Sequence, residues 1–280
     1  MSIIYLNGEY LPLEQAAVSV EDRGFLFGDG IYEVVRLYNG RIFQLEAHLR
    51  RWVHSAKGAQ LPLLNTVSEL PGILTRLKEL NNLQDSEIYI QYTRGNAHPR
   101  THAFPKETFP TLLAMPVELH PPSAETYAHG ASAITVPDLR WQRCDIKSIM
   151  LLPNVMAKQQ AREQGAFEAI LVRDGWVTEG SSTNILAVLE GQLTTHPLNG
   201  HILGGITRQV VLSLANALGI AAREKAFTVE QMYAASEVFL TSTTSEVLPI
   251  TRIDGRPIGD GRPGPVTRRL YDAFLQETKR

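Results

Sequence analysis

The sequence contains very little cysteine. Cys144 is the only cysteine among 280 residues, which excludes an intrachain disulfide and a zinc site built from several thiolates. The eight histidines form no HExxH motif, so we expect no metal site. A single cysteine is also typical of a protein that works in the reducing cytoplasm, and we expect that location.

Long hydrophobic runs and an excess of one charge are also missing. The composition is 44% hydrophobic and 20% charged with a net charge of −2, which is typical of a globular protein. The near-neutral balance gives no reason to expect a nucleic acid or an anionic membrane as the main partner. Apolar runs are too short to cross a bilayer, and the opening "MSIIYLNGEYLPLEQ" lacks the features of a signal peptide.

Several catalytic motifs are absent as well. The chain has no G-x-S-x-G elbow, no GxxxxGK[ST] loop and no GxGxxG fingerprint. A nucleophilic Cys144 stays open as an alternative. A cysteine flanked by Arg143 and Asp145 in an expected strand is, however, more typical of a buried residue without a catalytic role.

Turn signals divide the chain into hairpins. Asn-Gly pairs at 7–8 and 39–40 lie between alternating apolar residues and predict antiparallel hairpins. Further turns are expected at Asp174-Gly175 and Glu190-Gly191, and "EVFLTSTTSEVLPI" predicts strand, turn and strand. Helical periodicity predicts helices at about 45–58, 67–82, 154–165, 207–219 and 266–280, and Thr228 with Gln231 predicts a capping box.

The best domain boundary is "HPPSAE" at 120–125, which combines two prolines with small polar residues. It predicts a small N-terminal domain of residues 1–119 and a larger C-terminal domain of residues 126–280. Because hairpins dominate over regular β-α-β alternation, the expected class is α+β in two domains, with mixed or antiparallel sheets and packed helices.

Lys147 stands just before the apolar run at 149–152 in "CDIKSIMLLPN". A lysine beside a dry strand loses hydration of its ammonium, which lowers its pKa and favours the nucleophilic amine. Such an amine is suited to a Schiff base with a carbonyl compound. The stretch alone favours a surface lysine at a strand end, so the decision depends on partners elsewhere.

Pyridoxal 5'-phosphate would need such partners. Its phosphate needs amide and hydroxyl donors, and Gly204-Gly205 before a helix leaves the amides of Ile206 and Thr207 available. The hydroxyl-rich turn at 241–246 and Arg51 are further donor candidates. The pyridine nitrogen needs a carboxylate, for which Glu179 before "GSSTN" is a candidate.

Taken in order, these segments resemble the fold-type IV pyridoxal-phosphate aminotransferases. The resemblance covers nearly the whole chain and rests on the segments "RGFLFGDGIYEVVR", "HLRR", "CDIKSIMLLPNVMAKQQA", "GAFEAILV", "VTEGSSTNI", "LGGITR" and "TSTTSEVLPI". It implies a two-domain fold with the cofactor in the interdomain cleft and the cofactor lysine in the C-terminal domain. It also implies a homodimer whose sites are completed by a loop of the neighbouring subunit.

The resemblance assigns roles to individual residues. It implies that Lys147 is the cofactor lysine and that Glu179 is the partner of the pyridine nitrogen. It implies further that the phosphate is anchored by a set of four residues. These are Arg51, Ile206, Thr207 and Thr243.

Within the family, "HPRTHAFP" at 98–105 distinguishes the subgroups. Arg100 and His102 look like the carboxylate trap of D-amino-acid aminotransferases, working with Tyr32 of "GIYE". A guanidinium can grip the substrate α-carboxylate with two hydrogen bonds, while His102 and the Tyr32 hydroxyl add donors. The alternative is that Arg100 and His102 merely decorate a loop bounded by prolines.

The resulting hypothesis is transamination between a D-amino acid, such as D-alanine or D-glutamate, and a 2-oxo acid, such as 2-oxoglutarate or pyruvate. Three alternatives stay open. A branched-chain L-amino-acid aminotransferase shares the cofactor residues, and aminodeoxychorismate lyase shares the fold. A protein that only carries pyridoxal phosphate is the third, although carriage alone would not need both Lys147 and Glu179.

Overall fold

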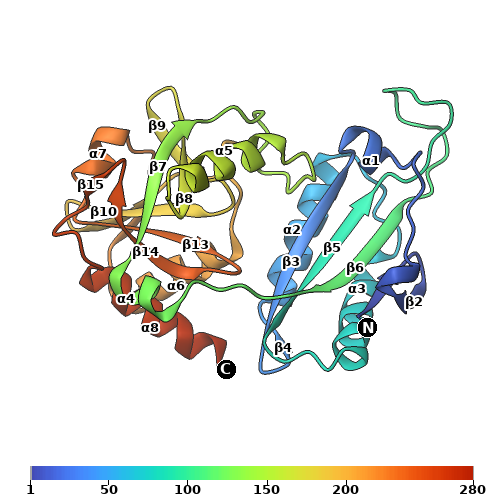
Figure 1. Cartoon of the computed structure of the whole chain (residues 1–280), viewed down its shortest axis with the longest axis horizontal. Helices are drawn as coiled ribbons and strands as arrows, with labels where there is room; N and C mark the ends of the chain where they lie inside the picture. Colours follow the sequence, from blue (N-terminus) through green and yellow to red (C-terminus); the bar gives the residue numbers. More distant parts are fainter. Residues whose placement is uncertain (1, 280) are drawn as a thin grey trace. The chain divides into compact units, whose positions relative to one another are not determined.

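The computed structural model describes residues 2–279, and the chain divides into two compact units (Figure 1). The N-terminal unit contains the chain up to Leu119 together with the short segment Ile146–Met150. The C-terminal unit contains His120–Asp145 and the chain from Leu151 onward. We had expected the cofactor lysine in the C-terminal domain, whereas the segment that carries Lys147 packs with the N-terminal unit.

The N-terminal unit combines one antiparallel sheet with two long helices. Its sheet has six strands in the order β2-β1-β6-β5-β3-β4. The strands are β1 Ile3–Leu6, β2 Glu9–Pro12, β3 Gly30–Tyr38, β4 Arg41–Ile42, β5 Ser86–Thr93 and β6 Thr111–Val117. The helices are the 3-10 turn η1 Leu13–Gln15, the short α1 Arg23–Phe27, and the long α2 Leu45–Gly58 and α3 Thr66–Leu80.

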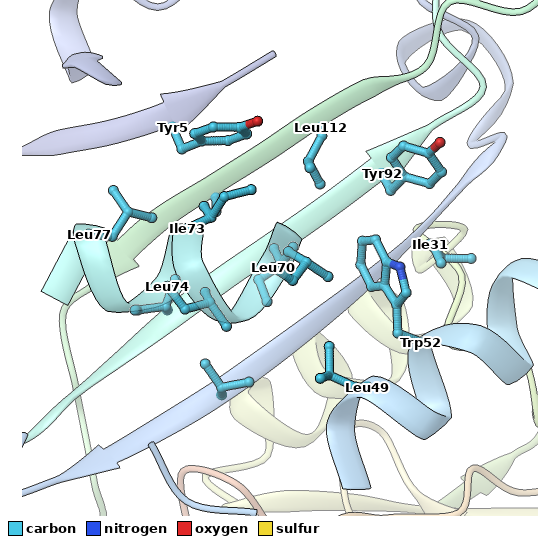
Figure 2. Packing of buried hydrophobic residues seen from close by; sticks show 14 of the residues in the cluster. Tyr5, Ile31, Leu49, Trp52, Leu70, Ile73, Leu74, Leu77, Tyr92 and Leu112 are labelled. Carbon is cyan, nitrogen blue, oxygen red and sulfur yellow. The ribbon is translucent and has the colours of Figure 1, made fainter. Parts of the chain in front are cut away.

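The core of the N-terminal unit lies between this sheet and helices α2 and α3. Figure 2 shows Leu70, Leu74 and Leu77 of α3 beside the strands, and Trp52 of α2 beside Tyr92 of β5. These side chains repeat every three or four residues along the helix, which is the spacing that buries one helical face. The helices expected at 45–58 and 67–82 are therefore confirmed.

The C-terminal unit is built on a nine-stranded mixed sheet. Its main path runs β12-β11-β10-β13-β14-β7-β8-β9, with β15 paired to β14. The strands are β7 Ala131–Pro137, β8 Glu168–Arg173, β9 Trp176–Gly180, β10 Asn184–Leu189, β11 Gln192–Thr195, β12 Ala222–Glu224, β13 Glu237–Ser242, β14 Glu246–Ile253 and β15 Arg256–Pro257. The helices are α4 Ala124–His129, α5 Leu152–Glu163, α6 Ile206–Ala217, α7 Val229–Tyr233 and α8 Pro265–Thr278.

Two apolar clusters support the C-terminal unit. The larger one gathers buried side chains of the sheet with Phe227 and Met232, and the smaller one packs Ala157 and Ala161 of α5 against β7 and β8. Together with the mixed sheet, these clusters confirm the α+β class.

Local turn chemistry explains the hairpins. Asn7 and Asn39 have φ of 49°, and Gly8 and Gly40 follow with φ of 103° and 73°, as the expected Asn-Gly turns require. Asp174-Gly175 and Glu190-Gly191 have the same left-handed pattern. The predicted capping box of α7 is also present, since the Gln231 amide donates to Thr228 and the Thr228 amide donates back.

One local expectation was wrong. No strand occupies 144–151, because this stretch makes only an isolated bridge between Ser148 and Ile31 before α5 begins at Leu152. The expected boundary segment 120–125 contains Ser123, which caps α4 by accepting the Thr126 amide at 3.1 Å. Among the residues that the structure describes, no helix is long and apolar enough to cross a membrane.

Candidate active site

Lys147 lies on a short backbone segment bound to the edge of β3. The Tyr32 amide donates to the Lys147 carbonyl at 3.0 Å, and the Lys147 amide donates to Ser55 Oγ of α2 at 3.0 Å. The neighbouring Ile146 enters the core of the N-terminal unit, whereas Lys147 is not part of that core. The half-buried Lys147 ammonium lies 4.2 Å from the centre of the Tyr32 ring.

The face of β3 that carries Tyr32 is aromatic. The Tyr32 ring stacks on Tyr89 of β5 with centroids 5.6 Å apart, and the Tyr89 hydroxyl donates to Gln91 Oε1 at 2.7 Å. Burial raises the pKa of Tyr89 to about 12, so this hydroxyl stays protonated. Two of the expected site residues, Lys147 and Tyr32, are therefore in direct contact within the N-terminal unit.

Arg51 is held by a carboxylate on the core-facing side of β3. Glu33 accepts from Arg51 Nε at 2.7 Å and from Arg51 Nη2 at 2.8 Å, and its Oε2 lies 2.8 Å from His48 Nδ1. Burial would raise the pKa of Glu33, but Arg51 and His48 outweigh it and hold this pKa well below its usual range. Burial lowers the pKa of His48. Glu33 raises this pKa, whereas Arg51 and Lys147 lower it further.

Glu179 is the second-last residue of β9 in the C-terminal unit, and it is buried, with 5% exposed. One carboxylate oxygen accepts from Arg140 Nη1. The other accepts from Asn184 Nδ2 at 2.9 Å and from the Leu203 amide at 3.0 Å. Three donors on separate segments thus fix the orientation of this carboxyl group.

Burial dominates the titration of Glu179. It raises the pKa of this carboxyl to about 7, although Arg140 lowers it. Arg140 is itself held by Asp138, with Nε to Oδ1 and Nη2 to Oδ2 both at 2.9 Å. The carboxyl is therefore rigid but easily protonated, and a neighbouring positive charge would favour its ionised form.

Asn184 links Glu179 to the start of α6. Its Nδ2 also donates to the Leu203 carbonyl at 2.9 Å, and a Cβ on Gly205 would come within 2.0 Å of its Oδ1. Glycine at 205 therefore allows the close approach that seats the first turn of α6 beside Asn184. Across the sheet, Asn184 pairs with Thr241, two residues before Thr243.

The first turn of α6 carries the expected phosphate donors. Ile206 and Thr207 are the first two helical residues and are 4% and 5% exposed. Among the residues that the structure describes, no side chain caps this helix start. The amides of a helix's first turn have no acceptor within the helix, so this turn is suited to bind an anion.

The turn after Glu179 is fixed by Glu168, which is fully buried. This carboxylate accepts from Ser181 Oγ at 2.5 Å and from Thr183 Oγ1 at 3.1 Å. The polar residues of "GSSTN" therefore do not simply line a solvated turn. They fix the turn between β9 and β10, across which the Glu179 and Asn184 side chains meet.

The loop at 98–105 carries Arg100 and His102 on the surface of the N-terminal unit. The Arg100 guanidinium lies 4.4 Å from the centre of the Phe27 ring, and the His102 ring meets Phe27 edge to face at 5.4 Å. The two residues expected to trap a carboxylate thus share one aromatic neighbour in α1.

Several residues that matter to this geometry were not singled out from the sequence. They are Phe27, Glu33, Arg140, Glu168 and Asn184. Glu33 and Phe27 belong to "RGFLFGDGIYEVVR", so the sequence shows their motif but not their roles. Arg140 lies 39 residues before Glu179, and no local pattern links them.

The family model of amino-transferase class IV matches residues 30–253. The D-alanine aminotransferase of Staphylococcus haemolyticus is 46% identical over 275 residues, covering 98% of this chain and 97% of the relative. The D-alanine aminotransferase of Bacillus licheniformis is 45% identical, covering 98% of both chains.

Solved structures of the same architecture also match. The branched-chain amino acid aminotransferase of Escherichia coli superposes with a TM-score of 0.91 at 28% identity, covering 98% of this chain and 94% of that one. Another branched-chain amino acid aminotransferase, solved with pyridoxamine 5'-phosphate, gives 0.91 at 29% identity, covering 98% and 93%. The branched-chain enzyme of Thermoproteus uzoniensis, solved with norvaline, gives 0.86 at 30% identity, again covering 98% and 93%. The chain therefore belongs to the class IV aminotransferase family.

Proposed function

We propose that the chain is a D-amino-acid aminotransferase that moves an amino group from a D-amino acid to a 2-oxo acid. D-alanine and D-glutamate are the donors to test first, with 2-oxoglutarate or pyruvate as acceptor. The observation that carries this proposal is Glu179, a buried carboxylate held by Arg140, Asn184 and the Leu203 amide. Such a group is suited to balance the charge of a protonated ring nitrogen.

The residues present fit pyridoxal 5'-phosphate. When bound, this cofactor supplies an aldehyde for attachment to an amine and a ring that withdraws electrons from the substrate Cα. Lys147 offers the amine and Glu179 the carboxylate for the ring nitrogen. Ile206 and Thr207 offer amides for the phosphate, and Thr243 offers a hydroxyl.

Arg51 completes the proposed phosphate set. Its Nε and Nη2 are bound to Glu33, so the guanidinium is held in one orientation before any ligand arrives. A guanidinium fixed in this way loses little side-chain entropy on binding a phosphate.

Lys147 does the proton chemistry in this proposal. As a free amine it removes the proton from the substrate Cα, and its ammonium form returns a proton when the amino group is transferred. Its contact with the face of Tyr32 stabilises the ammonium, while its half-buried position limits hydration.

Substrate recognition is assigned to Arg100, His102 and Tyr32, which would bind the α-carboxylate. The full-length relatives named as D-alanine aminotransferases support the choice of D-amino acids. A branched-chain L-amino-acid aminotransferase is the second candidate, because the matched structures carry that name.

We further propose that the enzyme is a homodimer of the cytoplasm. The outer face of α5 exposes Leu152 at 70%, Val155 at 59% and Met156 at 58%, a spacing that gathers apolar side chains on one stripe. A contiguous exposed apolar stripe favours a partner surface, and a second copy is the partner that the family pattern suggests. Sedimentation of the purified protein would measure the assembly directly.

The cofactor assignment is tested by reduction with borohydride. The purified protein should absorb visible light, and reduction should leave the cofactor mass on the peptide that contains Lys147. Lys147→Ala should abolish both signals and transamination. Lys158→Ala is a matched control, because Lys158 also lies over an aromatic ring, with Nζ 4.8 Å from the centre of Phe167. A colourless protein, or equal activity in both variants, would refute the assignment.

The substrate assignment is tested by comparing D-alanine with L-leucine, each with 2-oxoglutarate as acceptor. We expect turnover of D-alanine at a much higher kcat/KM. Good turnover of L-leucine without any of D-alanine would favour the branched-chain alternative. Turnover that continues without a 2-oxo acid would favour the lyase.

A further inference from the structure

We infer that Phe27 is a positioning residue that holds Arg100 and His102 as a carboxylate trap, with α1 serving as their platform. This inference rests on the proposed function and deepens it. All residues concerned belong to the N-terminal unit.

The loop that carries Arg100 and His102 is exposed, but a buried arginine binds its backbone through hydrogen bonds. Arg23 is 3% exposed, and its guanidinium donates to the carbonyls of Thr101 at 2.7 Å, His102 at 3.3 Å and Ala103 at 3.3 Å. Three successive carbonyls on one guanidinium fix the backbone on both sides of His102. The loop is therefore ordered without secondary structure of its own.

A second buried arginine supports the same loop. Arg94 lies 3.7 Å from the centre of the Phe104 ring, and Asp29 accepts from both Arg94 and Arg23 at 2.8 Å. Because Asp29 lies between them, its carboxylate offsets the repulsion between the two buried guanidinium groups.

Phe27 then orders the side chains on this fixed backbone. The Arg100 guanidinium carbon lies over the ring, 4.4 Å from its centre, and that of Arg23 lies 4.8 Å from the same centre. The donors of a guanidinium lie in its plane, so a ring can hold its carbon while N–H groups stay available for a carboxylate. His102 contacts the same ring at 5.4 Å, so Phe27 sets the positions of both trap residues together.

The test measures KM and kcat of the holoenzyme for D-alanine and for 2-oxoglutarate. Phe27→Leu removes the stacking face and should raise KM for both substrates about 3- to 10-fold, with a smaller change in kcat, because both carry the same α-carboxylate. Phe27→Tyr keeps the ring face and should restore KM to near the wild-type value. Phe25→Leu is the control, since Phe25 lies on the same helix but is 75% exposed.

A double-mutant cycle separates positioning from general support of the fold. In an Arg100→Ala background, which itself raises KM, Phe27→Leu should raise KM little further, because its effect passes mainly through Arg100. Turnover of a primary amine without a carboxylate should be the same in wild type and Phe27→Leu.

Each failure has a distinct meaning. This inference would be overturned if Phe27→Leu left KM unchanged, or if it raised KM as much in the Arg100→Ala background as in the wild type. The proposed function would still stand in that case, provided that the wild type turns over D-alanine. If the wild-type holoenzyme turns over no D-amino acid, the proposed function falls and this inference falls with it.

Discussion

At Glu179, burial and hydrogen bonding act in opposite directions on one carboxyl group. Burial is the larger influence and raises its pKa from 4.5 to about 7. The native state therefore retains a proton that the unfolded chain has already lost at intermediate pH. In the cofactor-free protein, the free energy of unfolding therefore falls as pH rises from about 4.5 through 7, because the native state loses the advantage of its bound proton.

This linkage gives a prediction for Glu179→Gln. Between pH 5 and pH 7.5 the variant should gain about 2 kcal/mol of stability relative to wild type, given a pKa of about 7 in the native state. Urea unfolding of both cofactor-free proteins at the two pH values measures the difference. Glu14→Gln, at an exposed site, serves as the control. A Glu179→Gln difference that does not vary with pH would show that the carboxyl is ionised throughout.

The sequence located some of these residues and not others for a physical reason. Lys147 and Glu179 each stand in a motif of consecutive residues, so the sequence alone pointed to them. Arg140 and Asn184 reach Glu179 through sheet register and loop packing. Such contacts depend on how distant strands pair, which local residue patterns do not specify.

At the scale of elements, α1 has only five residues, too few to show helical periodicity. Asp22 caps its start: Oδ1 accepts the Gly24 amide at 2.7 Å, and Oδ2 accepts from Thr93 at 2.9 Å and Thr111 at 2.7 Å. Its existence thus depends on tertiary contacts, and the sequence did not predict it. The long helices and the Asn-Gly hairpins were predicted because their signals are local.

The same packing predicts that Gly24→Ala destabilises the protein. A Cβ at this position would lie 2.3 Å from Thr93 Cγ2, inside a packed junction. We expect a loss of about 1–3 kcal/mol in the free energy of unfolding. Gly72→Ala on α3 is the matched control, because a Cβ there would have nothing within 4 Å and alanine is the better helix former.

Chemical denaturation of the two glycine variants measures this contrast. Gly72→Ala should match or exceed the wild type by up to about 1 kcal/mol. Equal stability of Gly24→Ala and wild type would mean that α1 shifts freely, and that it cannot serve as a rigid platform for Phe27.

At the scale of the whole molecule, the proposed cofactor ligands are divided between the two units. Lys147 and Arg51 belong to the N-terminal unit, and Glu179 and Thr207 belong to the C-terminal unit. If one cofactor uses both sets, its binding free energy stabilises both units. A ligand at 100 times its Kd adds about 2.7 kcal/mol.

Removal of the cofactor should therefore lower amide protection in both units. Hydrogen exchange followed by mass spectrometry, with and without pyridoxal 5'-phosphate, resolves peptides from each sheet. Lys158→Ala should behave as wild type, and Lys147→Ala should gain less protection from the cofactor. A gain confined to one unit would show that the ligands assigned to the other are wrong.

The segment Ile146–Met150 also limits how the chain can be divided. Its five residues pack with the N-terminal unit, while the chain on either side belongs to the C-terminal unit. A fragment ending at Leu119 would lack Ile146 from its core and the backbone partner of Tyr32. A recombination event that joined the first 119 residues of one relative to the remainder of another would therefore pair the lysine segment with a strand from a different parent. Such chimaeras should inherit the N-terminal fold intact only when the parents also agree in these five residues.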